Sequence, residues 1–192
     1  EIITKYAFQD TNFLLENNVK MIVAACGTVS SVAGKKLESD LPVPYTGVIN
    51  PTAFCYCKKD KKQGRIGVIA NSRYNKAHIT TRLVFEKLNP EFKVFEKACP
   101  LFVPLAEEGW TNNEVAYKTA EIYLKELLDK DIDSIILGCT HYPLLKACIG
   151  KIVGEKVKIV DPAKATALKV KNYLTSHDML NDLNTEKHTF YV

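Results

Sequence analysis

The sequence has no apolar run that approaches the roughly 20 residues needed for a membrane-spanning helix. Its first residues also lack the charged segment followed by an apolar segment that is typical of a secretory signal. These two absences argue against a membrane protein and against a secreted one. We therefore expect a cytoplasmic protein without a membrane partner.

The chain also lacks the residue clusters that bind metals or nucleic acids. Cys55 and Cys57 form the one closely spaced cysteine pair, and no second pair or histidine cluster at zinc-ligand spacing accompanies them. The formal net charge is only +4, and the densest basic run, residues 58–62, is typical of a solvated loop. We expect no metal and no nucleic-acid partner. Reduced thiols are expected rather than disulfides, because the chain has no secretory signal.

What the sequence does have is an alternation of short apolar segments and segments with helical periodicity. This alternation predicts βαβ units with parallel sheets, an α/β fold. The predicted helices cover residues 2–16, 29–37, 76–88, 113–128, 143–152 and 163–174. The predicted strands cover residues 20–25, 45–49, 65–70, 93–97, 134–137 and 158–160, and the apolar residues 188–192 predict one more strand. Asp161 is expected to cap the last helix.

Two cysteines, Cys26 and Cys139, occupy nearly the same local setting. Each follows a short apolar run and precedes a segment with helical periodicity. At such a turn the first free N–H groups of the helix favour a thiolate, so we expect a base at each strand end. Taken alone, Cys26 is equally well interpreted as a small buried apolar residue. The cysteines without this setting are interpreted as packing or surface thiols: Cys55, Cys57, Cys99 and Cys148.

Several segments resemble bacterial glutamate racemases. Residues 137–145, Leu-Gly-Cys-Thr-His-Tyr-Pro-Leu-Leu, together with residues 98–105 and Glu107, resemble the second half of that family. Residues 23–28 are similar to its first cysteine motif, and residues 160–163 to its last strand and helix start. The resemblance runs through essentially the whole chain, and the nine-residue string is its most specific part.

The resemblance implies a cofactor-independent racemase that interconverts L-glutamate and D-glutamate, the latter for peptidoglycan synthesis. It implies that Cys26 and Cys139 are catalytic: one removes the α-proton from one face, and the other returns a proton to the opposite face. A planar carbanion can invert only if a base and an acid flank it. The implied partner is glutamate as a small-molecule substrate, and the resemblance also allows a homodimer.

The resemblance also assigns roles to residues near the cysteines. His141 matches a histidine that assists the second cysteine, which suits a group that titrates near neutral pH. Glu107 matches an acidic catalytic residue, with a solvated loop carboxylate as the alternative. Gly27, Thr28 and Thr140 are the expected substrate-binding residues, because hydroxyls and backbone N–H groups can hold a carboxylate. Helix capping is the alternative role of the two threonines.

The chain departs from the family at several places. The family's N-terminal strand, with an aspartate beside the first cysteine, has no counterpart, nor has the next segment, which holds substrate, or the C-terminal end. Both ends of the chain are therefore expected to be fragment boundaries, and Cys26 is expected to lack its acidic partner. Gly27 stands where the family has asparagine, and Ala70-Asn71 stands where it usually has Gly-Thr.

The resemblance implies two similar α/β domains with the active site in the cleft between them. Residues 1–49 and 160–192 are expected to form the first domain, which is incomplete, and residues 50–159 the second. Asn50-Pro51, a turn signal, marks the boundary between them.

Three alternatives remain open at this point. The first is an aspartate racemase, which also uses two cysteines. The second is a catalytically impaired fragment that only binds an amino acid or a protein. The third, a thiol redox protein based on Cys55 and Cys57, is weakened by the absence of a Cys-x-x-Cys motif at a helix start. A related hypothesis is that the half-site of Cys139 and His141 exchanges the α-proton of one enantiomer without completing the inversion.

Overall fold

The computed structural model describes residues 1–57, 63–71, 75–181 and 188–191. It confirms the predicted α/β class. The strands are β1 (Ile22–Ala24), β2 (Tyr45–Gly47), β3 (Gly64–Ala70), β4 (Phe92–Ala98), β5 (Ser134–Leu137) and β6 (Lys158–Val160). The helices are α1 (Ile2–Glu16), α2 (Gly27–Val32), α3 (Gly34–Asp40), α4 (Ile49–Cys57), α5 (Asn75–Leu88), α6 (Phe102–Glu107), α7 (Glu114–Leu128), the 3-10 helix η1 (Tyr142–Leu145), α8 (Lys146–Val153) and α9 (Pro162–Ser176). Within these described ranges, no helix has the length and apolar character needed to cross a membrane.

The larger sheet has four parallel strands in the order β4-β3-β5-β6. Strand β3 lies inside this sheet, with Ile66 paired to Val94 on β4 and to Ser134 on β5. Successive side chains point to opposite faces, and helices cover both faces. Ile69 packs with residues of α6, α7, η1 and α8 on one face, and Ile66 packs with residues of α4 and α5 on the other. This double burial explains why β3 and β5 are almost continuously apolar.

The smaller sheet pairs β1 with β2, also in parallel, with Val23 opposite Thr46. Its core is small, because the buried apolar residues that pack together here are Ala7, Ala33 and Leu37. The side chain of Val23 is 40% exposed. This part of the molecule therefore gains less stability from apolar burial than the part around the larger sheet.

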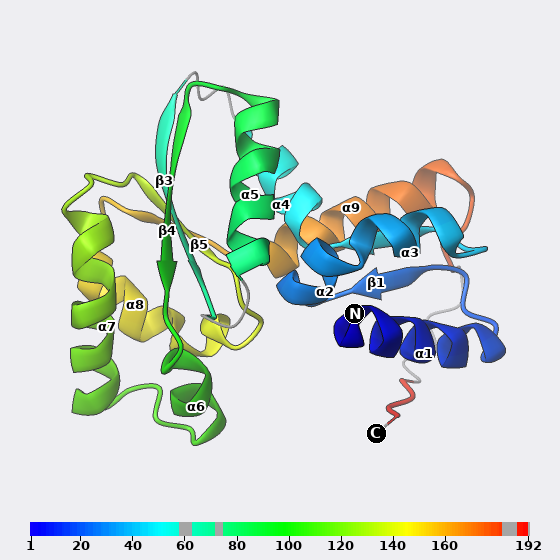
Figure 1. Cartoon of the computed structure of the whole chain (residues 1–192), viewed down its shortest axis with the longest axis horizontal. Helices are drawn as coiled ribbons and strands as arrows, with labels where there is room; N and C mark the ends of the chain where they lie inside the picture. The colour runs from blue at the N-terminus through cyan, green and yellow to red at the C-terminus, as the bar shows by residue number, and fades with distance from the viewer. Residues whose placement is uncertain (58–62, 72–74, 182–187, 192) are drawn as a thin grey trace.

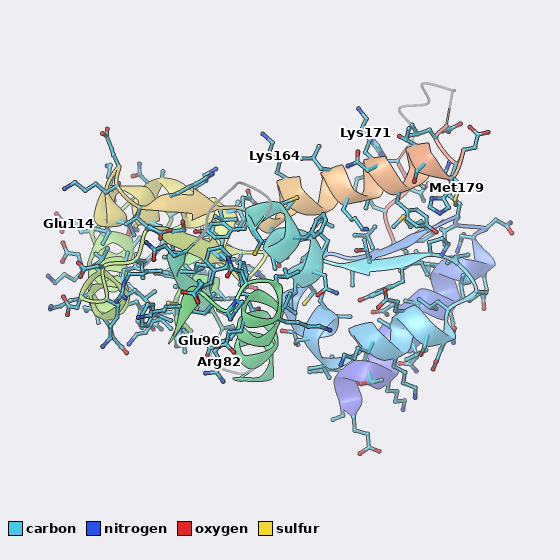
Figure 2. The ribbon with its side chains drawn as sticks, turned by 90° about the horizontal axis from the view of Figure 1, so that it is seen from above. Arg82, Glu96, Glu114, Lys164, Lys171 and Met179 are labelled. Carbon is cyan, nitrogen blue, oxygen red and sulfur yellow. The ribbon has the colours of Figure 1, made fainter. Side chains whose placement is uncertain are left out.

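Figure 1 shows the elements in two groups, one around each sheet. Helix α9 comes late in the chain but lies with the smaller sheet, where it contacts β2 and α4. In the view of Figure 2, Lys164 and Lys171 follow α9 from the middle of the molecule toward Met179, at the end opposite Glu114. The group around β1 and β2 thus combines early and late segments of the chain.

Two predicted elements differ from those observed in the first part of the chain. The single helix predicted over residues 29–37 is wrong, because the helix ends at Val32 and a second helix begins at Gly34, a residue of low helix propensity. The turn signal at Asn50-Pro51 lies within the first turn of α4. Proline fits there because the first N–H groups of a helix have no partner in the helix.

The strand predicted over residues 188–192 is also wrong for the residues that the structure describes. Residues 188–191 pair with no strand in the described part of the chain. The ring of Tyr191 instead packs edge-on against Phe13 of α1 at 4.9 Å, and its hydroxyl donates a hydrogen bond of 2.9 Å to Asn17. An apolar, β-branched pattern alone was a poor predictor here, since a strand also needs a partner edge.

Candidate active site

The carboxyl ends of β1, β3 and β5 meet at a small pocket that contains both predicted catalytic cysteines. The pocket is lined by Cys26, Gly27, Thr28, Ala70, Asn71, Gly138, Cys139 and Thr140. Its volume of about 30 Å³ is enough for one or two water molecules. The structure thus brings the two cysteine motifs together at the sheet ends where parallel α/β folds bind ligands.

The pocket is narrow because the two cysteine turns nearly touch. A Cβ atom on Gly27 would lie 2.9 Å from the carbonyl oxygen of Gly138, closer than side chains come to such atoms. A Cβ atom on Gly138 would lie 2.6 Å from the carbonyl oxygen of Ile69, which accepts the Gly138 N–H at 2.8 Å. The absence of a side chain at Gly27 therefore lets the two cysteine turns approach each other, and its absence at Gly138 lets the Cys139 turn lie close to the end of β3.

Two successive contacts connect the Cys139 thiol to an imidazole and then to a carboxylate. The Sγ atom of Cys139 lies 3.7 Å from Nδ1 of His141, and Nε2 of His141 lies 3.2 Å from Oε1 of Glu107. A neutral imidazole has one donor and one acceptor nitrogen. When Nε2–H donates to the Glu107 carboxylate, Nδ1 is left to accept the proton of the thiol. This geometry is suited to a proton relay, and it contains three of the four residues predicted to be catalytic.

Glu107 reaches the histidine because it is the last residue of α6, a helix that the sequence analysis does not predict. Prolines around this segment favour a loop, yet Pro104 lies in the first turn of the helix, where proline is tolerated. The buried ring of Phe102 anchors α6 at 5.3 Å from the ring of Tyr142. The Tyr142 hydroxyl in turn donates to the carbonyl oxygen of Cys99 at 2.9 Å. The larger core therefore holds both ends of the relay.

Burial raises the pKa of the Cys139 thiol above its usual value. Hydrogen bonds from the backbone N–H groups of His141 and Thr140 oppose this effect, and negative charge on Cys26 adds to it. The expectation that a helix start favours the thiolate is therefore wrong for Cys139. The helix that follows is η1, a 3-10 helix of 4 residues that begins only at Tyr142, so its positive potential at the thiol is small.

The thiol of Cys26 lies in a different setting. Cys26 is the N-cap residue of α2 and has an extended backbone, with φ −130° and ψ 125°. In the described part of the chain, no histidine or carboxylate hydrogen-bonds to this half-buried thiol. Burial raises the pKa of Tyr45 on β2 to about 12; a hydrogen bond with Ser30 opposes this shift, and negative charge on Glu38 and Cys26 adds to it.

Thr28 and Thr140 line the pocket, but neither caps the helix that follows it. The N-cap residues of α2 and η1 are Cys26 and His141, and no side chain caps either helix. The capping alternative is therefore wrong for both threonines. Asp161 does cap α9, as predicted, and accepts a backbone N–H at 2.9 Å.

Ala70, Asn71 and Gly138 line the pocket, although they are not among the predicted site residues. The available signal is their position. Ala70 and Asn71 lie at the carboxyl end of β3, and Gly138 lies at that of β5. In a parallel sheet this position alone indicates proximity to a ligand. For Ala70 and Gly138 residue type gave no such signal, because alanine and glycine carry no functional group.

The remaining cysteines lie outside this pocket. Cys99 and Cys148 are buried, as expected for packing thiols, and burial raises the pKa of Cys99 to about 12. Cys55 and Cys57 are half-buried, and all six cysteines of the chain are free thiols. Among the residues that the structure describes, no group of three histidine, cysteine or acidic side chains is arranged to hold a metal ion.

Comparison with known sequences agrees with the predicted family. The sequence model of the Asp/Glu/Hydantoin racemase family matches residues 5–170. The glutamate racemase of Geobacter metallireducens is 41% identical over 193 aligned positions, which cover 100% of this chain and 71% of that relative.

Comparison with solved structures gives the same result. Glutamate racemase isoform RacE1 from Bacillus anthracis superposes with a TM-score of 0.84 at 32% identity, covering 94% of this chain and 67% of that one. Glutamate racemase from Francisella tularensis, solved in complex with D-glutamate, superposes with a TM-score of 0.83 at 32% identity, covering 95% and 67%. The chain therefore belongs to the Asp/Glu/hydantoin racemase family and is an amino-acid racemase, an isomerase.

Proposed function

We propose that the protein interconverts L-glutamate and D-glutamate, without a cofactor, by proton transfer between two cysteines. The observation that carries this proposal is the pocket shared by Cys26 and Cys139, with His141 and Glu107 in line behind Cys139. The choice of substrate is supported by relatives named glutamate racemase and by the D-glutamate bound to one of them.

The proposed reaction breaks one C–H bond at the α-carbon and forms another on the opposite face. A cysteine thiolate takes the α-proton, and the electron pair stays on the α-carbon as a planar carbanion. The opposite cysteine, as a thiol, gives its proton to the other face and becomes a thiolate. When Cys139 acts as the base, His141 first accepts its thiol proton, and Glu107 stabilises the resulting imidazolium. The reverse reaction exchanges the roles of the cysteines.

Substrate binding requires the pocket to widen. Its volume of about 30 Å³ is far below the roughly 300–1,000 Å³ of typical small-molecule pockets. Once the turns separate, Thr28 and Thr140 offer hydroxyls and Gly27 offers a backbone N–H to the substrate. Asn71, which lines the same pocket, adds an amide that can both donate and accept.

We place this site between two domains, formed by residues 1–49 with 160–192 and by residues 50–159. The biological role proposed for the protein is to supply D-glutamate for peptidoglycan synthesis in the cytoplasm. Expression of the chain in a bacterium that requires added D-glutamate tests this role, and growth without the supplement is the expected result. A homodimer stays a prediction, which light scattering of the purified protein tests.

The alternatives receive less support. The named relatives at 37–43% identity are glutamate racemases, which favours glutamate over aspartate as the substrate. A protein that only binds has no need for a thiol, an imidazole and a carboxylate aligned as Cys139, His141 and Glu107 are. A redox role for Cys55 and Cys57 is not favoured either, since the pKa of Cys57 is raised by burial.

The decisive experiment is incubation with each glutamate enantiomer in D2O, followed by chiral chromatography and mass spectrometry. Inversion by two thiols in exchange with solvent predicts that each enantiomer yields the other with one deuterium at the α-carbon. Aspartate is tested in parallel as a second substrate. Cys55→Ser, which alters a thiol outside the pocket, is the control variant and is expected to behave like the unaltered chain. Deuterium in one unchanged enantiomer alone would identify a working half-site without inversion. No deuterium in either enantiomer would contradict the proposal.

A further inference from the structure

The hydroxyl of Ser30 joins the Cys26 turn to the neighbouring strand of the smaller sheet. Its Oγ donates to the carbonyl oxygen of Cys26 at 2.7 Å and accepts the backbone N–H of Val48 at 3.1 Å. The carbonyl oxygen of Ala24 lies at 3.3 Å, but a hydroxyl has one proton and the nearer acceptor is Cys26. One side chain thus connects the cysteine to the residue that follows β2.

The surroundings of Ser30 are built to admit this hydroxyl. A Cβ atom on Gly47, the last residue of β2, would lie 2.7 Å from the Cβ of Ser30. Any larger residue at position 47 would therefore displace the serine. Gly47 pairs with Ala24 in the register of the small sheet, so the contact lies directly beside the strand end that carries Cys26.

The Cys26 carbonyl is held twice, because the backbone N–H of Ser30 also donates to it at 3.0 Å. A serine hydroxyl that bonds to a carbonyl four residues earlier is common in helices. The additional hydrogen bond with Val48 is different, since it joins α2 to the residue that follows β2. This hydrogen bond helps to hold the Cys26 turn in place. The helix that follows the turn, α2, has only 6 residues and no side-chain cap.

We propose that Ser30 is a positioning residue for Cys26, which sets the location of this thiol in the pocket without contacting the substrate. This inference rests on the proposed function for its catalytic consequence, though its structural part can be tested without turnover. Loss of the hydroxyl frees the Cys26 turn and leaves the Cys139 relay intact. Inversion is therefore impaired, while α-proton exchange at the Cys139 side continues.

The first test is alkylation of the full chain with iodoacetamide, with the rate at each cysteine followed by mass spectrometry. Ser30→Ala is expected to raise the rate at Cys26 about fivefold, the change that one net hydrogen bond supports, and to leave the rate at Cys139 unchanged. Ser39→Ala, which removes an exposed hydroxyl on α3, is the matched control. Unchanged rates at Cys26, or equal increases at both cysteines, would overturn the proposal.

Gly47→Ala provides a second variant that keeps the serine but displaces it, and it is expected to reproduce the effect at Cys26. In D2O, both variants are expected to lose inversion about fivefold more than they lose α-deuterium exchange of the enantiomer handled at Cys139. A loss of both in equal proportion would argue for a general structural role and against positioning. If the unaltered chain shows no turnover, the proposed function fails, and the alkylation rates still decide the role of Ser30.

Discussion

The two cysteine turns share one pocket, yet different parts of the molecule hold them. The Cys139 turn follows a strand that is buried on both faces, and Tyr142 just beyond it is fully buried and bonded to the backbone of Cys99. The Cys26 turn follows β1, which has 3 residues and belongs to the two-stranded sheet. The second turn is therefore fixed by a large core, whereas the first depends on a few specific contacts.

The two turns differ in their chemistry as well. Cys139 contacts an imidazole that in turn contacts a carboxylate, and Cys26 has the N-cap position of a short helix and the hydrogen bond from Ser30 to its carbonyl oxygen. This difference shows that two cysteines proposed to act in a symmetric reaction need not have similar surroundings. In the proposed reaction, titratable groups would control the proton at Cys139, whereas the contacts of Cys26 would mainly fix where its thiol lies.

Replacing the cysteines is expected to have the largest effect and tests the comparison most directly. Cys139→Ser removes the acid and base of one face, so racemisation and α-deuterium exchange at that side are expected to fall about 10³-fold. Cys26→Ser is expected to reduce racemisation as strongly but to spare exchange of one enantiomer. Chiral chromatography with mass detection in D2O measures both quantities. Equal loss of exchange in the two variants would remove the proposed asymmetry.

Core truncation compares the stability of the two parts. Leu37 and Leu145 are both fully buried, one in each part, and leucine-to-alanine changes in cores cost about 2–5 kcal/mol. Leu37→Ala is expected to open the part around β1 and β2 locally, whereas Leu145→Ala lowers the stability of the whole molecule. Hydrogen exchange with mass spectrometry distinguishes these outcomes. Identical exchange patterns in the two variants would show that the parts unfold as one unit.

Removal of the carboxylate tests the relay at Cys139. Glu107→Gln keeps a hydrogen-bonding group beside His141 but removes the charge that stabilises its imidazolium, and a decrease in kcat/KM of about tenfold is expected. Glu108→Gln, the adjacent exposed carboxylate, is the matched control and is expected to leave kcat/KM unchanged. A similar decrease in both variants would assign the effect to the overall charge of α6 and not to the contact with the histidine.

The smallest effect is expected in how the alkylation rate of Cys139 and the stability of the protein depend on pH. Burial raises its pKa, so its alkylation at pH 8 is expected to be a few-fold slower than that of a cysteine in a short peptide. The same shift stabilises the folded protein below the usual thiol pKa of about 8.5, and this stabilisation is lost as the pH rises through the higher folded value. Alkylation and thermal unfolding measured between about pH 7 and 10 test both points. Faster alkylation than the peptide would contradict this interpretation.

Local patterns in the sequence were enough to predict most of the fold. The helices α1, α5, α7 and α9 and the strands β3 to β6 lie within one or two residues of their predicted bounds, because each has a clear periodicity or a clear stop signal. The failures have separate causes. A boundary was expected at Pro51 and a loop after Pro100, yet Pro51 and Pro104 lie inside first turns of helices. Residues 188–191 have the composition of a strand but no partner edge.

In the candidate site, too, some features were predictable from local patterns and others depend on the tertiary structure. The two thiols, the histidine and the racemase family are encoded in short contiguous motifs, so the residues themselves were sufficient to predict them. The contact of Glu107 with His141, the approach of Gly27 to Gly138 and the hydrogen bond that the Val48 N–H donates to Ser30 join segments that are separated along the chain. Such contacts depend on how two sheets and their helices pack in space, and no periodicity or motif within one segment contains that information.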